Sequence, residues 1–246
     1  MDRSIYIAMN GAKQILQAQA SNANNLANVS TTGFKTDLEQ FRSQPVFGPV
    51  YPSRVYAMAE RPGVDMSTGS LLTTGRDLDV GVQGEGWIAV NGTDGKEAYT
   101  RAGDLHVTSQ GQLVTGTGLQ VVGNSGPIAL PPYSKLEIGA DGTVSIIPQG
   151  GVATGMAAVD QIKLVNPPKD QLEKLEDGLI HVKGGQPAPA DPAVKLTTGV
   201  LETSNVSAVE EMVHMIDLQR QYELQIKLMK SVEDDGAAGA QLLKMG

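Results

Sequence analysis

The chain has 246 residues, of which 40% are hydrophobic and only 4% aromatic, and its formal net charge is −8. This acidic balance argues against nucleic acid as the main partner, because phosphate binding depends on clustered Lys and Arg. The absence of cysteine excludes disulfides, thiolate metal ligands and cysteine nucleophiles. No run approaches the roughly 18 apolar residues of a membrane span, and no basic stretch with an apolar core opens the chain. We therefore expect neither membrane insertion nor a cleaved export signal.

The N-terminal segment has a helical pattern. Apolar residues recur at steps of three and four from Ile5 to Leu26, which predicts a helix over residues 4–28. A β-branched and polar run closed by Gly33 follows, and it favours a stop and a turn. One glycine and several asparagines weaken the helix, so we expect it to be ordered only when it packs against something.

The longest helical pattern lies near the C-terminus, after Gly199. Ser207 with Glu210 three residues later is typical of a capping box at a helix start. One apolar stripe then follows, made of Val209, Met212, Val213, Ile216, Tyr222, Ile226 and Met229. A second set falls off this stripe: Leu218, Leu224 and Leu228. Either these leucines widen a single core-facing stripe, or the helix has more than one neighbour, as in a packed assembly. We expect this helix to pair with the N-terminal one.

The middle of the chain has a different composition. All thirteen prolines lie between Pro45 and Pro192. Residues 36–74 are irregular and predict a partly extended linker with a hairpin, whose extended pieces would include Val46, Phe47, Val50, Tyr51, Val55 and Tyr56. Residues 78–194 show short strands separated by Gly- and Asp-rich turns, which is typical of an antiparallel β domain.

These patterns together predict an α+β fold in which paired, coiled-coil-like terminal helices carry an inserted antiparallel β-rich domain. We expect the helices within residues 1–35 and 200–246. Residues 36–75 and 195–199 would link them to a β-rich outer domain over residues 76–194.

Few residue patterns indicate chemistry. The three histidines are scattered without metal-ligand spacing, and the glycine-rich run 81–86 has the wrong order for a dinucleotide fingerprint. Asp77 with Asp79, or Glu210 with Glu211, are carboxylate pairs, but no pocket signal surrounds them. We expect no catalytic residues, no metal, no cofactor and no enzymatic activity.

Three stretches together resemble one family, the axial proteins of the bacterial flagellum. The first is residues 23–28, Ala-Asn-Asn-Leu-Ala-Asn, continued by Thr31, Gly33, Phe34 and Lys35. The second combines residues 78–87 with Tyr-Thr-Arg-Ala-Gly at 99–103 and Gly-Gln-Leu-Val at 111–114. The third combines Gly-Val-Leu-Glu at 199–202 with residues 204–212 and Gln-Arg-Gln-Tyr-Glu at 219–223. The opening residues 1–6 and the chain length resemble the rod subunit of the proximal rod, whereas the distal rod subunit is similar but longer.

The resemblance implies a structural subunit that polymerises helically through its terminal helices into the hollow rod, a drive shaft that transmits torque and passes exported subunits. It implies a location in the basal body, in the periplasm, after export from the cytoplasm without a cleaved signal. Its partners would be copies of itself, other rod subunits, hook-side and base-side axial proteins, the export apparatus and the surrounding ring bushing. A distal rod subunit, or a secreted β-domain binding module on a helical stalk, are the alternatives.

The same resemblance and the helical stripes supply a set of expected assembly residues. Among them, Asn25, Asn28 and Asn205 would cap helix ends or bind neighbouring chains through their amides, and Gly33 would permit the exit turn. The full set is Ile5, Met9, Ile15, Leu16, Asn25, Leu26, Asn28, Gly33, Phe34, Lys35, Asn205, Val209, Met212, Val213, Ile216, Arg220, Tyr222, Glu223 and Ile226.

Overall fold

The computed structural model describes residues 2–46, 55–149, 155–175 and 177–244. Internal contacts divide the chain into two compact units. The helical unit comprises residues 1–28, 37–65 and 206–246, and the β unit comprises residues 29–36 and 66–205. Each unit is thus assembled from segments that are far apart in the sequence.

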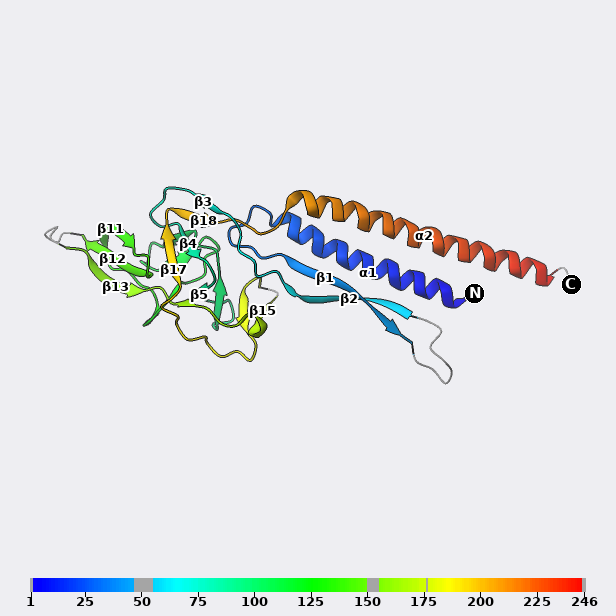
Figure 1. The fold of residues 1–246 in the computed structure, drawn as a ribbon, viewed down its shortest axis with the longest axis horizontal. Coiled ribbons are helices and arrows are strands. Elements are labelled where there is room, and N and C mark those ends of the chain that lie inside the picture. The colour runs from blue at the N-terminus through cyan, green and yellow to red at the C-terminus, as the bar shows by residue number, and fades with distance from the viewer. Residues whose placement is uncertain (1, 47–54, 150–154, 176, 245–246) are drawn as a thin grey trace. The chain divides into compact units, whose positions relative to one another are not determined.

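The helical unit consists of two helices and one hairpin. The helices are α1 (Asp2–Ala27) and α2 (Ala208–Lys244), and they run side by side as predicted (Figure 1). The predicted cap of α2 is present, because the Glu210 N–H donates to the Ser207 hydroxyl at 3.4 Å. Among the described residues, no helix combines the length and apolarity needed to cross a membrane.

The hairpin of the helical unit joins β1 (Asp37–Pro45) to β2 (Val55–Val64). It confirms the hairpin expected in this region; the extended pieces predicted at Phe47, Val50 and Tyr51 lie outside the described residues. Two side chains of α1 bind β2: Asn10 Nδ2 donates to the Ala57 carbonyl at 2.7 Å, and the Ala59 N–H donates to Gln14 Oε1 at 2.7 Å. The hairpin therefore packs along α1 instead of forming a loose linker.

The β unit contains short strands joined by tight turns. The early strands are β3 (Leu71–Thr73), β4 (Val80–Gln83), β5 (Trp87–Asn91), β6 (Glu97–Thr100), β7 (Leu105–Val107), β8 (Leu113–Thr115), β9 (Val122–Gly123) and β10 (Gly126–Pro127). The later ones are β11 (Tyr133–Ile138), β12 (Thr143–Pro148), β13 (Ala157–Gln161), β14 (Leu164–Val165), β15 (Leu172–Lys174), β16 (Ile180–Val182), β17 (Lys195–Thr198) and β18 (Val200–Glu202), with a short 3₁₀ turn, η1 (Lys169–Gln171). The strand pairs among these described residues are antiparallel, as predicted.

Two sheets and several strand pairs organise this unit. The larger sheet has the order β14-β5-β6-β16-β15, and the smaller has the order β11-β12-β13. The last strands of the unit pair with its first ones, β17 with β4 and β18 with β3. The unit therefore closes by joining the two ends of its own sequence.

The β unit buries two apolar clusters. The larger contains fully buried side chains such as Ile88, Leu105, Leu113 and Ile146. The smaller surrounds Trp87 and Tyr99. Because β4–β8, β11, β12 and β14 contribute to the larger cluster, strands of the two sheets share one core.

Leu113→Ala is expected to lower the free energy of unfolding of the β unit by about 2–5 kcal/mol, because it deletes a fully buried side chain and leaves a cavity. Fluorescence of the buried Trp87, the only tryptophan, would follow urea unfolding. Leu72→Ala is the control, since that side chain is 59% exposed in β3 and should change stability by less than about 0.5 kcal/mol. Equal losses in the two variants would contradict this packing.

The Tyr99 hydroxyl provides a second test. It donates to Glu97 Oε1 at 2.9 Å and accepts the Ala188 N–H at 2.7 Å, and burial raises the pKa of Tyr99 to about 12. Since the folded pKa lies above the ordinary value of about 10, the stabilisation is fully present below pH ~10 and is lost as the pH rises toward 12. We expect a fall in stability across this interval that Tyr99→Phe reduces, measured by urea unfolding at each pH. An identical alkaline loss in both proteins would contradict it.

Candidate assembly interface

The inner face of α2 is the set of residues turned toward α1. Leu218 is almost fully buried and packs with Ile15, Ala18 and Tyr222. Half-buried or buried positions recur along α2 at alternating steps of four and three, at Glu211, Met215, Leu218, Tyr222, Gln225, Met229 and Val232. This spacing is that of a coiled-coil seam. The predicted core-facing stripe was therefore wrong in part, because Leu218, which lay off that stripe, occupies the centre of the seam.

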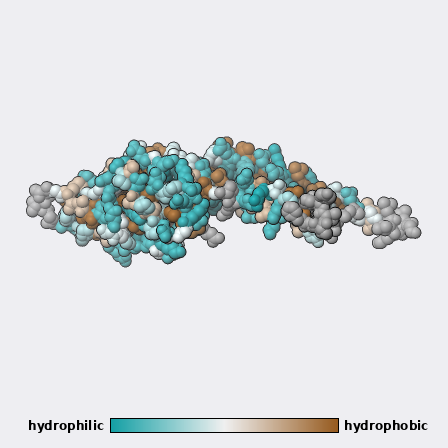
Figure 2. Space-filling model, turned by 60° about the horizontal axis from the view of Figure 1, so that its bottom comes forward, coloured by the Kyte–Doolittle hydropathy of each residue, from teal (hydrophilic) through white to brown (hydrophobic). Residues whose placement is uncertain are grey.

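The opposite faces of both helices carry large apolar side chains in solvent. On α2, seven such side chains are between 41% and 70% exposed: Val209, Met212, Val213, Ile216, Leu224, Ile226 and Leu228. On α1, Tyr6, Met9 and Leu16 are about half exposed. Figure 2 shows hydrophobic surface among the polar side chains of the helical unit. Two alternatives were open for Leu218, Leu224 and Leu228: a widened core-facing stripe, or a helix with more than one neighbour. This arrangement favours a helix with more than one neighbour.

A polar layer lies where α1 ends. Asn22 Nδ2 donates to Glu211 Oε2, and Asn25 Nδ2 donates to Glu211 Oε1 at 3.4 Å. Asn25 also pairs with the backbone of Asp37, donating to its carbonyl and accepting its N–H, both at 3.0 Å. The buried Asn25 amide therefore binds within its own chain. Because these bonds fit only one alignment of the helices, the layer fixes their register.

The segment between α1 and β1 makes a turn that only glycine fits. Gly33 has φ +66°, and a Cβ there would lie 2.3 Å from the Arg101 carbonyl carbon. Phe34 is half-buried beneath the Lys174 ammonium, whose Nζ lies 4.0 Å from the ring centroid and donates to the Lys35 carbonyl at 2.8 Å. The predicted exit turn at Gly33 is thus present.

Lys35 is buried in an ion-pair cluster of the β unit. Its Nζ lies 2.6 Å from Glu202 Oε1, and Arg101 Nη1 lies 2.7 Å from Glu202 Oε2. The Arg101 guanidinium also stacks 5.3 Å from the centroid of the Trp87 ring. Neither Arg101 nor Glu202 was among the expected assembly residues, although both lie inside the stretches that carried the family resemblance.

The expected assembly residues therefore occupy different environments. Met9, Leu16, Val209, Met212, Val213, Ile216, Arg220, Glu223 and Ile226 are exposed. Ile15, Asn25 and Lys35 are buried, whereas Ile5, Leu26, Asn28, Gly33, Phe34, Asn205 and Tyr222 are half-buried. Asn28 Nδ2 donates to the Asn24 carbonyl at 2.9 Å, and Asn205 Oδ1 accepts the Thr36 N–H at 2.9 Å, so both amides bind their own chain.

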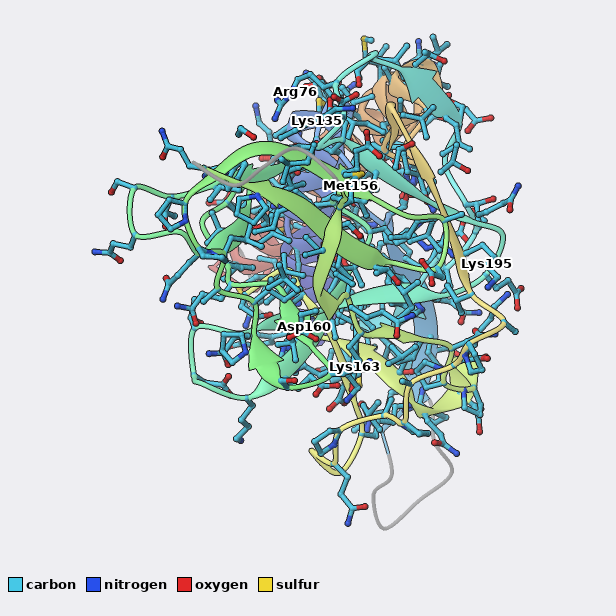
Figure 3. The ribbon with its side chains drawn as sticks, turned by 90° about the vertical axis from the view of Figure 1, so that its left-hand side faces the viewer. Arg76, Lys135, Met156, Asp160, Lys163 and Lys195 are labelled. Atoms are coloured by element: carbon cyan, nitrogen blue, oxygen red, sulfur yellow. The ribbon has the colours of Figure 1, made fainter. Side chains whose placement is uncertain are left out.

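The β unit shows no convergence of reactive groups in the part that the structure describes. No group of three or more His, Asp or Glu side chains there is placed to hold a metal ion. A groove of about 740 Å³ is lined mainly by prolines, amides and small residues of segments 166–171 and 182–191. Figure 3 shows the labelled side chains spread over one end of this unit: Arg76, Lys135, Met156, Asp160, Lys163 and Lys195.

Comparison with known proteins places these features in a family. Three family models match the chain: "Flagella basal body rod protein" over residues 5–35, "Flagellar hook protein FlgE/F/G D1 domain" over 81–146, and "Flagellar basal body rod FlgEFG protein C-terminal" over 197–242. The flagellar basal-body rod protein FlgF of Escherichia coli K12 is 42% identical over 251 residues, covering 100% of both chains. The chain belongs to the flagellar basal-body rod protein family.

Other rod proteins show the same relationship. FlgF of Salmonella typhimurium is 41% identical over 251 residues and 100% of both chains. FlgG of Bacillus subtilis is 30% identical over 258 residues, covering 95% of this chain and 96% of that relative. The recognition made from the sequence is confirmed, and the rod family is a structural one whose members are components of the flagellar basal body.

Leu218→Ala should destabilise the helix pair by about 2–4 kcal/mol, because Leu218 is the most buried side chain of the seam. Ile216→Ala, two residues away and 51% exposed, should cost less than about 0.5 kcal/mol in the isolated protein. Helical circular dichroism during urea unfolding would measure both. A larger effect of Ile216→Ala would place the seam on the other face.

Proposed function

We propose that this protein is a structural subunit of the flagellar rod that polymerises helically through the outer faces of α1 and α2. Its position would be the proximal rod, as the resemblance of residues 1–6 implies, and it would act in the periplasm as part of a hollow shaft. It would have no catalytic role. The shaft would transmit torque and pass exported subunits.

The exposed apolar residues of the two helices carry this proposal. The helix pair already has an inner seam, so residues such as Val213, Ile216 and Leu224 are not needed for pairing within one chain. Large apolar surface of this kind marks a protein interface. Contacts between unlike faces of identical subunits build an open helix when they do not close into a ring.

The polar residues among the expected set would serve two roles. Arg220 and Glu223 are exposed beside the apolar face, where charges select partners more than they add affinity. Asn22, Asn25 and Glu211 would act indirectly, by holding the register that presents the outer faces. The Ser21 hydroxyl and the side-chain amide oxygen of Asn22 are buried beside this layer without a hydrogen-bond partner in the described chain.

The partners would be further copies of this chain, other rod subunits, and the hook-side and base-side axial proteins. The export apparatus and the surrounding ring bushing would contact the protein before and after assembly. Concentration-dependent assembly of the purified protein would separate this function from a binding module on a helical stalk, because such a module would remain monomeric.

Ile216→Asp should abolish incorporation into rods and flagellar motility while leaving the β unit folded, because the carboxylate would be desolvated at the subunit interface. The purified variant should keep its Trp87 fluorescence and urea midpoint. Leu26→Asp, at a half-buried position of α1, should behave in the same way. Ser231→Asp adds the same charge at an exposed polar position of α2 and is the control. Normal motility in both Ile216→Asp and Leu26→Asp would refute helix-mediated assembly.

A further inference from the structure

The chain enters and leaves the β unit through two segments that bind each other. The entry segment is residues 29–36, and the exit segment is residues 199–205. The Gly33 N–H donates to the Glu202 carbonyl at 2.8 Å, and the Asn205 N–H donates to the Phe34 carbonyl at 3.4 Å. The Thr36 N–H and hydroxyl both donate to Asn205 Oδ1, at 2.9 and 2.8 Å. The two segments are therefore joined before they reach β1 and α2.

A single carboxylate fastens this junction to the body of the β unit. Glu202 Oε1 accepts the Lys35 ammonium at 2.6 Å and the Gly69 N–H at 2.9 Å, while Oε2 accepts Arg101 Nη1 at 2.7 Å. The three charged side chains are no more than 2% exposed. Lys35 comes from the entry segment, Glu202 from the exit segment, and Arg101 from the end of β6. One buried cluster thus joins three parts of the chain.

Both cations also donate to backbone carbonyls. Lys35 Nζ donates to Ser67 at 2.6 Å, and Arg101 donates through Nε to Gly86 at 2.9 Å and through Nη2 to Gly84 at 2.7 Å. The cluster contains two cations and one carboxylate. The carbonyls and the face of the Trp87 ring stabilise the two cations.

Burying such a cluster is a poor way to gain stability, because desolvation offsets most of the attraction between the charges. What a cluster of charges with fixed directions does supply is a single geometry, since no other pairing satisfies all three groups. Gly33 and Gly69 support this geometry, because a Cβ at either position would lie within 2.3 Å of the backbone of Arg101 or Thr203, respectively.

We propose that Lys35, Arg101 and Glu202 are positioning residues that clamp the entry and exit segments together and fix the path by which the chain leaves the β unit. Rod assembly requires this path, and the clamp acts independently of the apolar faces of the helices. This inference rests on the proposed rod function.

Lys35→Met tests the clamp while keeping the β unit intact. It leaves the Arg101–Glu202 ion pair and the hydrogen bond from the Gly69 N–H to Glu202 Oε1 in place, so the β unit should stay folded in the absence of urea, as read from Trp87 fluorescence, although the loss of a buried partner lowers its urea midpoint. The N–H groups of Gly33, Thr36 and Asn205 should exchange with solvent at least ~10-fold faster in the full-length protein, because their segments are released. In cells lacking the native gene, swim-ring growth should fall at least ~10-fold. Lys35→Arg, which keeps the charge, should recover a substantial part of both.

Lys163→Met is the matched control, because it breaks another ion pair of the same unit, Lys163 Nζ to Glu97 Oε1 at 2.7 Å, outside the two segments. It should leave motility and the three exchange rates unchanged. Wild-type motility with Lys35→Met would overturn the clamp, and so would unfolding of the β unit, which would make the cluster a general stabilising element. The rod function fails separately, through normal motility of Ile216→Asp and Leu26→Asp.

Discussion

The ion pairs of the buried Glu202 carboxylate link the segment by which the chain enters the β unit to the segment by which it leaves. Glu202 lies at the end of β18, one of the last strands of the β unit, and binds one cation from the entry segment and one from the residue that follows β6. A buried carboxylate has to be satisfied on both oxygens, and here each oxygen has a charged donor. The pairing of β17 and β18 with β4 and β3 brings these donors within reach. Strand order and ion pairing therefore specify the same closure of the domain.

The helical unit follows a different principle, because its helices pair through a thin seam. Small residues of α1, including Ala8, Ala12 and Ala18, are buried, whereas larger ones such as Met9 and Leu16 are exposed. Small side chains allow close approach of the helices but remove little apolar surface from water. Much of the apolar surface of these helices therefore stays exposed to solvent within one chain. Neighbouring subunits that covered the outer faces would supply the burial that one chain does not provide.

Much of the fold followed from local patterns in the sequence. The helices, the capping box and most strands were predictable because periodicity and turn residues are local signals. The inner face of α2 was not, since Ile216 and Leu218 are equally apolar and only the partner helix distinguishes them. The short strands β3, β17 and β18 lack a pattern of their own and form because β18 pairs with β3 and β17 pairs with β4 across the unit.

The contact between Lys35, Arg101 and Glu202 also could not be predicted from local sequence patterns. Lys35 is separated by 167 residues from Glu202, and Arg101 by 101, so no spacing rule connects them. Each lies in one of the three stretches that resemble the flagellar axial family, yet the stretches look independent when they are read along the chain. In the folded β unit they meet at one carboxylate. The signature residues Gly33, Lys35, Arg101 and Glu202 therefore lie together in the folded β unit, where the segments by which the chain enters and leaves this unit contact each other.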